Sequence, residues 1–483
     1  MQDKPKKPTL LQALMPVLSL MILLTVNVLV FGDSALDGSN QIVLVMATAI
    51  AIALAMRLGY SWQDIQQGMV GSLVTAIPSL LILLLVGALA GSWLLSGIIP
   101  AMIYYGLQIL SPTFFLVGAC IVCIVVSTAT GSSWTTVATI GIALMGIGKT
   151  LGLSPAMIAG AILSGAYFGD KLSPLSDTTN LAAAVSGTDL FTHIRYMTFT
   201  TVPSISIAMV LFLLLGFWGD SSAQAENTRN ALAAIQTSFN INIMLFLVPA
   251  VVVLLIVKKK PALPSLFVGI VLGAVFALLF QPDLVKAVSG SDGAVWRQYY
   301  IGLMKSLYGE ISIATGNATV DELLKSSGMA GMLGTVWLII VAMIFGGVME
   351  MCGALHRIIE AVSHLVKSTG SLVAATVATC GVFNVTASDQ YLAIVVPGRM
   401  YTNLFRKHNL APENLSRSLE DSGTVTSVLV PWNTCGAYHA NVLGVATLAY
   451  LPFCFFNLIS PFMSIAFAYM NIKIRRLDTN NAH

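Results

Sequence analysis

The chain has 483 residues, of which 56% are hydrophobic and only 9% are charged, and its formal net charge is +3. A soluble protein of this length needs far more charge on its surface, so the composition excludes a soluble globular protein. It predicts an integral membrane protein that is helical throughout and is surrounded by a lipid bilayer. The small net charge gives no indication of a nucleic-acid partner.

Long apolar runs predict the spanning helices, each of which needs about 20 mostly apolar residues. The first run, from Leu10 to Phe31, follows three lysines and is too long for the core of a signal peptide. We therefore expect a retained first transmembrane helix. The clear spans are predicted at 13–32, 41–58, 73–91, 114–127, 197–217, 242–257, 264–280, 332–351 and 451–470.

Shorter or interrupted apolar segments lie between these spans and are flanked by Gly, Pro, Ser, Thr or Asn. Non-helical backbone survives at membrane depth only where it is buried in protein or lines a polar cavity. Interrupted segments of this kind point to the binding site of a transporter. They are 93–110, 134–148, 155–169, 353–367, 371–384, 391–404, 416–430 and 437–450.

Basic residues indicate which helix ends face the cytoplasm. Lys4 and Lys473 predict that both termini are cytoplasmic, and the lysines at 258–260 predict a cytoplasmic end for the span 242–257. The acidic loop 33–40 and the polar stretch 218–241 suit the outside. Each half of the chain then crosses the membrane an odd number of times, which is the condition for an inverted repeat.

The two halves also resemble each other when the first is shifted by 257 positions. Pro155 then meets Pro412, Pro174 meets Pro431, and the polar break 127–134 overlies 384–391. We predict a first transmembrane repeat over 1–217, an external linker over 218–241, a second repeat over 242–473 and a cytoplasmic tail over 474–483.

Charged and polar side chains concentrate in the paired breaks. An ionisable group in the membrane interior costs roughly 2.5–3.5 kcal/mol or more, so each is a candidate functional residue. Carboxylates, hydroxyls, amides and free carbonyls are also the ligands that small hard cations prefer. The predicted ion- or substrate-binding residues are Asp170, Ser173, Ser176, Asp177, Thr178, Thr179, Asn180, Asn384, Asp389, Asp421, Thr424, Trp432, Asn433 and Thr434.

Several polar residues also have purely structural interpretations. Lys171 either forms a structural ion pair or extends towards the interface, and Asp170 or Asp177 either binds the ion or caps a helix. Glu420 is expected to point away from its neighbour Asp421, and His439 is expected to be a packed polar residue. The six cysteines show no zinc-like spacing, so no metal or redox role is expected of them.

Three long motifs carry a resemblance to a known family: 169-GDKLSPLSDTTNLA-182, 384-NVTASDQYLAIVVPGRMY-401 and 419-LEDSGTVTSVLVPWNTCGAY-438. With them, the chain resembles the NhaC family of bacterial sodium/proton antiporters over nearly its whole length. The resemblance implies an all-α polytopic membrane protein of two inverted-topology repeats, with discontinuous helices, re-entrant hairpins and roughly 10–12 spanning segments. It also implies that the matching aspartates are Na+ ligands, namely Asp170, Asp177, Asp389 and Asp421.

We therefore expect a secondary active transporter, and not an enzyme, that exchanges Na+ for H+ across a bacterial inner membrane by alternating access. Its carboxylates are expected to bind Na+ or H+ in competition, because burial favours the neutral acid and a bound cation favours the carboxylate. No cofactor is expected beyond the transported ions, and a homodimer is compatible with the sequence. Three alternatives stay open: a Na+- or H+-coupled exchanger of small organic anions or amino acids, of the malate/lactate type; a passive channel; and an intramembrane hydrolase.

Overall fold

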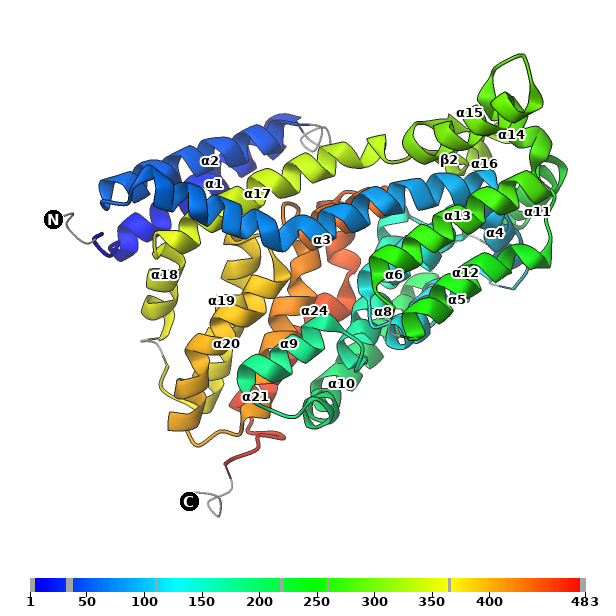
Figure 1. The fold of residues 1–483 in the computed structure, drawn as a ribbon. Coiled ribbons are helices and arrows are strands. Elements are labelled where there is room, and N and C mark those ends of the chain that lie inside the picture. Colours follow the sequence, from blue (N-terminus) through cyan, green and yellow to red (C-terminus); the bar gives the residue numbers. More distant parts are fainter. Residues whose placement is uncertain are drawn as a thin grey trace.

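A computed structural model of the chain describes residues 5–31, 38–109, 111–217, 221–258, 260–363 and 366–477. In this part of the chain the fold is almost entirely helical (Figure 1). Its named strands are β1 (Ile311–Ser312) and β2 (Lys325–Ser326), which pair antiparallel with each other. The predicted all-α polytopic fold is therefore confirmed.

The helices fall into three groups along the chain. The first group is α1 (Leu10–Phe31), α2 (Ser39–Arg57), α3 (Trp62–Leu95), α4 (Ile98–Ile109), α5 (Pro112–Thr130), α6 (Ser133–Thr136), η2 (Val137–Gly141), α7 (Ile142–Thr150), α8 (Pro155–Leu172), α9 (Asp177–Ser186) and α10 (Leu190–Gly216). The middle group is α11 (Ser221–Ser238), η3 (Ile243–Phe246), α12 (Leu247–Val257), α13 (Ala262–Phe280), α14 (Pro282–Ser289), α15 (Val295–Tyr308), α16 (Ala318–Leu323) and η4 (Ala330–Met332). The last group is α17 (Leu333–Met351), α18 (Ala354–Ser363), α19 (Thr369–Thr386), α20 (Gln390–Lys407), α21 (Pro412–Leu419), η5 (Glu420–Thr424), η6 (Ser427–Leu429), α22 (Thr434–Leu443), α23 (Thr447–Tyr450), η7 (Leu451–Phe453) and α24 (Phe455–Tyr469).

Eight helices of the described chain are long and apolar enough to cross a membrane, or up to ten if each of two bent helix pairs forms one span. This range meets the predicted 10–12 only at its lower end, because several of the interrupted segments are too short to cross alone. Seven of the nine clear spans predicted from the sequence coincide with these eight helices, and the other two, 242–257 and 451–470, fall on the bent pairs. The segment predicted as interrupted at 371–384 also qualifies by length and composition, as α19.

The secondary structure repeats with the same shift as the sequence. Pro112, Ser133, Pro155 and Asp177 begin helices, and so do the residues 257 positions later, namely Thr369, Gln390, Pro412 and Thr434. Left-handed backbone repeats as well. Gly131 (φ 69°) corresponds to Ser388 (φ 58°), Gly152 (φ 75°) to Asn409 (φ 56°), and Gly187 (φ 77°) to Gly444 (φ 64°). The second repeat thus keeps this conformation at two positions without glycine, where it costs free energy.

Equivalent helices of the two repeats run in opposite directions. Figure 1 shows α3 running from left to right and α17 running back beside it from right to left. Near the start of α3, Ser72 Oγ donates to the carbonyl of Met343 (2.7 Å), in the second half of α17. Near the end of α3, Gly87 lies directly against Gly328 and Met332, just before α17. The repeat is therefore inverted, as predicted.

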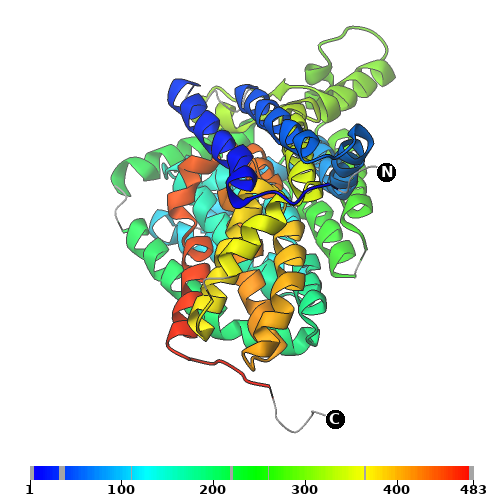
Figure 2. The same ribbon diagram turned by 90° about the vertical axis from the view of Figure 1, so that its left-hand side faces the viewer.

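Small residues allow the core helices to approach closely. A Cβ on Gly165 of α8 would lie 2.2 Å from the carbonyl oxygen of Cys120, so α8 and α5 pack backbone to backbone. Cys120 and Cys123 are buried in this contact and are free thiols. Figure 2 shows the yellow and orange helices of the second repeat below the blue helices α1–α3.

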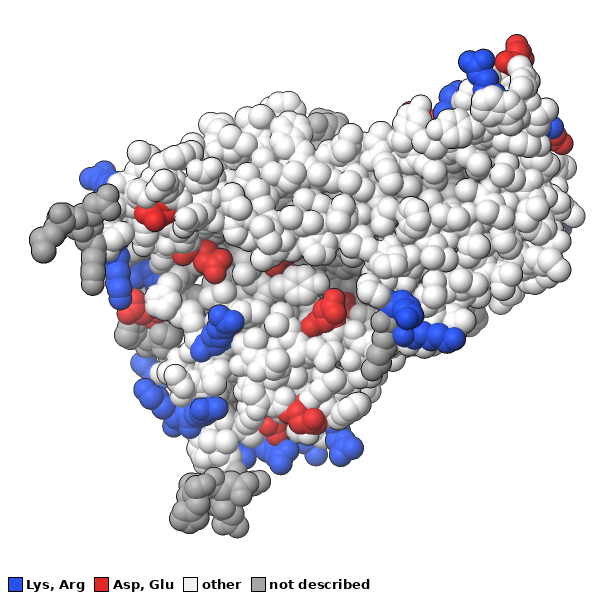
Figure 3. Space-filling view, viewed as in Figure 1, with Lys and Arg blue, Asp and Glu red and all other residues white. Residues whose placement is uncertain are grey.

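Charged side chains are unevenly distributed over the surface of the molecule. On the face shown in Figure 3, many of them lie on the left and lower left and at the upper right tip, with a further group below the middle, and a broad uncharged area occupies the upper middle and right. This distribution suits a protein that spans a bilayer. Lys4, Lys259 and most of the segments 33–40 and 474–483 lie outside the described residues, so their predicted sidedness stays a prediction.

Candidate functional site

In each repeat, two broken helices touch each other at their breaks. In the first repeat, Gly131 lies against Leu175, where an added Cβ would be 2.6 Å from the carbonyl carbon. In the second, the carbonyl of Ser388 accepts a hydrogen bond from the Thr434 amide (2.9 Å). Four helix N-termini therefore follow the breaks, capped by Ser132, Ser176, Asp389 and Asn433. This is the discontinuous-helix arrangement that the interrupted segments predicted.

Asp421 forms an ion pair with Lys171, and this pair joins the two repeats. Lys171 lies at the end of α8, Asp421 lies in the π-helical turn η5, and both side chains are fully buried. Asp421 also accepts hydrogen bonds from Thr200 of α10 (2.8 Å to Oδ2) and Ser460 of α24 (3.2 Å to Oδ1). Three elements, α8, α10 and α24, thus supply one ammonium and two hydroxyls to a single buried carboxylate on η5.

The ammonium of Lys171 has no exposed side. Its Nζ lies 3.4 Å from Ser460 Oγ and 5.7 Å from the centre of the Phe456 ring. Lys171 is therefore not an interfacial residue that extends to water. Of the interpretations that the sequence allowed, the structure supports the ion pair, and the acid is Asp421 of the other repeat.

Asp170 and Asp389 cap helices. Asp170 Oδ2 accepts from the backbone amide (3.0 Å) and the hydroxyl (2.7 Å) of Ser133, at the start of α6. Asp389 Oδ1 accepts from the amides of Tyr391 (2.9 Å) and Leu392 (3.0 Å), at the start of α20. Each carboxylate thus stabilises a helix N-terminus and retains one oxygen outside these bonds.

Asp177 differs from the other three aspartates because it is exposed. It is the first residue of α9, and the cap of that helix is Ser176, whose Oγ accepts from the Thr179 amide (3.4 Å). Asp421 is joined to Lys171 in the other part of the site. In the described chain, no three His, Cys, Asp or Glu side chains lie close enough to hold one metal ion. The four aspartates therefore do not form one common carboxylate cage.

The hydroxyls and the amide of the first break mostly support the local backbone. Ser173 Oγ accepts from the Leu175 amide (3.2 Å), and Thr179 Oγ1 donates to the carbonyl of Lys171 (3.0 Å). Thr178 shares a hydrogen bond with Ser176 (3.1 Å). Asn180 donates to the carbonyl of Ser176 (2.7 Å) from an exposed position. These bonds hold the break rigid beside Lys171.

Amides connect the breaks of the second repeat. Asn384 Nδ2 donates to the carbonyl of Gly423 (2.8 Å), and Asn433 Nδ2 donates to the carbonyl of Asn384 (3.0 Å). Trp432 Nε1 donates to the carbonyl of Val385 (2.7 Å). Thr434 Oγ1 lies 3.4 Å from Asn433 Oδ1. Trp432, Asn433 and Asn384 therefore fix the crossing of the two broken helices.

Three buried polar residues near the ion pair were not among the predicted site residues. Thr200 and Ser460 contact Asp421 from helices that lack a polar break, so no local pattern marks them. Glu420 has other neighbours than Asp421, and it is fully buried and near the hydroxyls of Thr178 and Thr424. Neither of its carboxylate oxygens makes a hydrogen bond of normal geometry, and Thr424 Oγ1 is also without one. Adjacent acids at 420 and 421 were the signal that could have found it.

Other expected residues have structural surroundings. His439 is buried, with Nε2 3.2 Å from the Tyr167 hydroxyl and its ring against Tyr438, as expected of a packed polar residue. A cavity of about 600 Å³ lies beside the second break. It is lined by Pro431 and by residues of α17 and α22, including Thr335 and Asn441.

Comparisons with known proteins agree with this architecture. The family model described as "Na+/H+ antiporter family" matches residues 165–472, which include both pairs of breaks. The chain is 38% identical to the Na+/H+ antiporter NhaC of Alkalihalophilus pseudofirmus, over 90% of this chain and 91% of that protein. It is 35% identical to the malate-2H+/Na+-lactate antiporter of Bacillus subtilis, over 96% and 95% of the two chains.

A third relative comes from an archaeon. The chain is 34% identical to the arginine/ornithine antiporter ArcD of Halobacterium salinarum, over 99% of this chain and 95% of that protein. The inverted repeat, the crossed helix breaks and the extent of these similarities lead to one assignment: the chain is a multi-pass membrane protein of the Na+/H+ antiporter family.

Proposed function

We propose that this protein exchanges Na+ for H+ across the cell inner membrane by alternating access, and that Asp421 is the principal Na+ ligand. The observation that carries the proposal is the fully buried ion pair between Lys171 and Asp421. An ionisable pair in a membrane interior is costly and is a functional candidate by default. This pair also links the two repeats, whose relative movement would open the site to either side.

In this proposal, Na+ and the ammonium of Lys171 compete for one carboxylate. Thr200 and Ser460 already direct hydroxyl oxygens at Asp421, and oxygen atoms are the ligands that hard cations prefer. When Na+ replaces the ammonium, Lys171 stays buried and loses its ion-pair partner. A buried unpaired ammonium is strongly disfavoured, so Lys171 releases its proton. One Na+ bound then corresponds to one H+ released, and the charge of the site is unchanged.

This mechanism changes one detail of the expectation from the sequence. There, each aspartate was expected to bind Na+ or H+ directly. At Asp421 the competing occupant is instead a protonated lysine. Asp170 and Asp389 are proposed to position the broken helices and to offer their second oxygen to the ion as it passes. Asp177, which is exposed, is proposed to attract cations to the entrance.

A second candidate function is exchange of a small organic anion or amino acid coupled to Na+ or H+. Two observations favour it: the relatives named for malate/lactate and arginine/ornithine exchange, and the cavity of about 600 Å³ beside Pro431. A solute carboxylate there would meet the hydroxyl of Thr335 and the side-chain amide of Asn441, which line the cavity. The same cavity would admit hydrated Na+, so it is compatible with both functions.

One experiment separates these functions. Purified protein is reconstituted into vesicles that contain a pH-sensitive dye, and Na+, Li+, K+, malate, lactate, arginine and ornithine are added in turn. We expect Na+ alone to drive proton movement, and Asp421→Asn to abolish it. Proton movement that requires an organic solute would favour the second function. Ion current without proton exchange would indicate a channel.

A further inference from the structure

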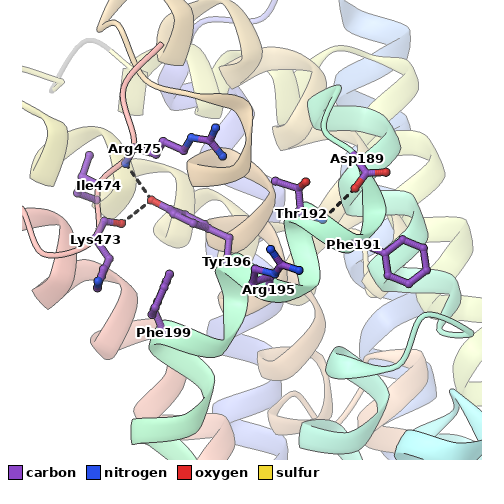
Figure 4. A pocket seen from close by; sticks show the side chains of 9 residues that line it. All are labelled: Asp189, Phe191, Thr192, Arg195, Tyr196, Phe199, Lys473, Ile474 and Arg475. Carbon is purple, nitrogen blue, oxygen red and sulfur yellow. Dashed lines mark hydrogen bonds between the residues drawn. The ribbon is translucent and has the colours of Figure 1, made fainter. Parts of the chain in front are cut away.

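A second cavity of about 600 Å³ lies away from the helix breaks, at the end of the molecule where the C-terminus emerges. Its wall is formed by the first turns of α10 and by the segment that follows α24. Figure 4 shows its side chains: Asp189, Phe191, Thr192, Arg195, Tyr196, Phe199, Lys473, Ile474 and Arg475. Three of these side chains are cationic and one is acidic.

The single acid in the wall is already engaged. Asp189 caps α10, because its Oδ2 accepts from the Thr192 amide (2.9 Å). Arg475 Nη1 is paired with Glu413 (2.8 Å), which does not line the cavity. The guanidinium of Arg195, in contrast, makes no hydrogen bond or ion pair with the described residues. Lys473 Nζ lies 4.8 Å from the centre of the Phe199 ring, without an acidic partner in the described chain. The cavity therefore presents positive charge that no residue in the described part of the chain neutralises.

A further cation lies directly behind the wall. Arg417 is fully buried, and its guanidinium lies 4.5 Å from the centre of the Tyr196 ring. Its Nη1 donates to the carbonyl of Lys473 (3.3 Å), whereas its Nε and Nη2 have no hydrogen-bond partner. A buried, incompletely paired cation of this kind is unfavourable unless an anion compensates it. Tyr196 and Lys473, which contact the Arg417 guanidinium, also line this cavity.

The apolar side chains at the cavity indicate what kind of anion fits. Phe191 is 67% exposed and Phe199 is 37% exposed, and both stand on α10 beside the cations. Aromatic side chains next to basic ones are typical of the membrane interface, where basic pockets between helices hold lipid headgroups. A phosphate would meet Arg195 and Lys473, and acyl chains would lie along the apolar face of α10.

From these contacts we propose that the cavity binds the phosphate headgroup of an anionic phospholipid. The cavity is a separate site from the ion pair at Asp421, because its lining includes no residue of the helix breaks and none of the residues that contact Asp421. A bound lipid would link the two repeats, because α10 ends the first and the segment at 473–475 follows the last helix of the second.

The test measures lipid binding to the purified full chain in detergent, by native mass spectrometry and by the shift of the unfolding temperature. The probes are phosphatidylglycerol, phosphatidylcholine and inorganic phosphate. The variant Arg195→Gln/Lys473→Gln removes two pocket cations. The matched control, Lys286→Gln/Arg297→Gln, removes the same charge from α14 and α15. Arg195→Lys/Lys473→Arg retains the charge in the pocket.

We expect phosphatidylglycerol to bind the wild type, the control and the charge-retaining variant equally well. It should bind the pocket variant about 30-fold more weakly, because each lost cation removes about 1 kcal/mol of binding free energy. Equal weakening in the control would overturn the proposal, because attraction would then be diffuse. Binding of phosphatidylcholine as tight as phosphatidylglycerol, or of inorganic phosphate without preference for the lipid, would also overturn it. So would wild-type binding in the pocket variant.

Discussion

The ion pair at the centre of the molecule makes a sharp prediction for Lys171→Met. This substitution keeps much of the volume of the side chain but removes its charge, and it leaves Asp421 buried without its partner. Removing one member of a buried pair costs about 3–5 kcal/mol. The variant should therefore unfold at a lower temperature than the wild type in the absence of Na+.

Na+ should reverse this loss of stability. In the wild type, Na+ must displace the ammonium, whereas in the variant Asp421 is free to accept it. If Na+ no longer has to break the ion pair with Lys171, at a cost of about 3 kcal/mol, Na+ affinity rises on the order of 100-fold. A ligand at 100 times its dissociation constant stabilises the folded state by about 2.7 kcal/mol. The unfolding temperature of Lys171→Met should thus depend strongly on Na+ concentration, and that of the wild type only weakly.

Thermal unfolding of purified protein, titrated with NaCl against choline chloride, measures this effect. Arg417→Met is the matched control, because it removes an equally buried cation that has no ion-pair partner in the described chain. It should show no added response to Na+. The double variant Lys171→Met/Asp421→Asn removes both charges, so it should be nearly as stable as the wild type and insensitive to Na+. If Lys171→Met is stable without Na+, or unresponsive to it, the reasoning fails.

Three further predictions concern other residues. Glu420→Gln should raise the unfolding temperature, because it replaces a buried acid whose oxygens lack hydrogen bonds. The variant should also retain Na+-driven exchange. Loss of exchange with normal folding would instead place Glu420 in the ion site. Ser388→Gly should stabilise the fold by about 1 kcal/mol in denaturant unfolding, because Ser388 has a φ of 58° where its counterpart is Gly131; a destabilised variant would refute this. The Thr315 hydroxyl and amide donate to Asp321 (2.6 Å each) and lower the pKa of that carboxyl. The stabilising effect of the ionised Asp321 is therefore present above the ordinary Asp pKa and is lost as pH falls through the lowered value. In the wild type, amide hydrogen exchange around Thr315 should accelerate only in acid. In Asp321→Asn, the same exchange should be accelerated at every pH.

Much of the fold could be predicted from the sequence because the bilayer restricts what a chain can form. Apolar runs marked each clear span, and the shift of 257 positions located helix starts that coincide in the structure, such as Pro155 and Pro412. Exact helix lengths were less predictable. α3 begins at Trp62, well before the predicted 73, because Ser61 and Asp64 form a capping box on a polar first turn.

The partners of the site residues could not be predicted in the same way. Local motifs identified Lys171 and Asp421, but their pairing depends on how the two repeats cross. Thr200 and Ser460 reach Asp421 from helices with ordinary apolar patterns. Asp170 and Ser133 are far apart in sequence, so the helix that Asp170 caps became evident only from the fold. Tertiary contacts of this kind leave no local signal.

Proton release on Na+ binding tests the central claim most directly. Purified protein in weakly buffered detergent solution, with a pH indicator, is mixed with NaCl, and bound Na+ is measured in parallel by isothermal titration calorimetry. If Na+ displaces the ammonium of Lys171 from Asp421, about one proton is released for each Na+ bound by the wild type. Lys171→Met should bind Na+ and release none at this site. Undiminished proton release from Lys171→Met would show that another group carries the proton and would contradict the mechanism.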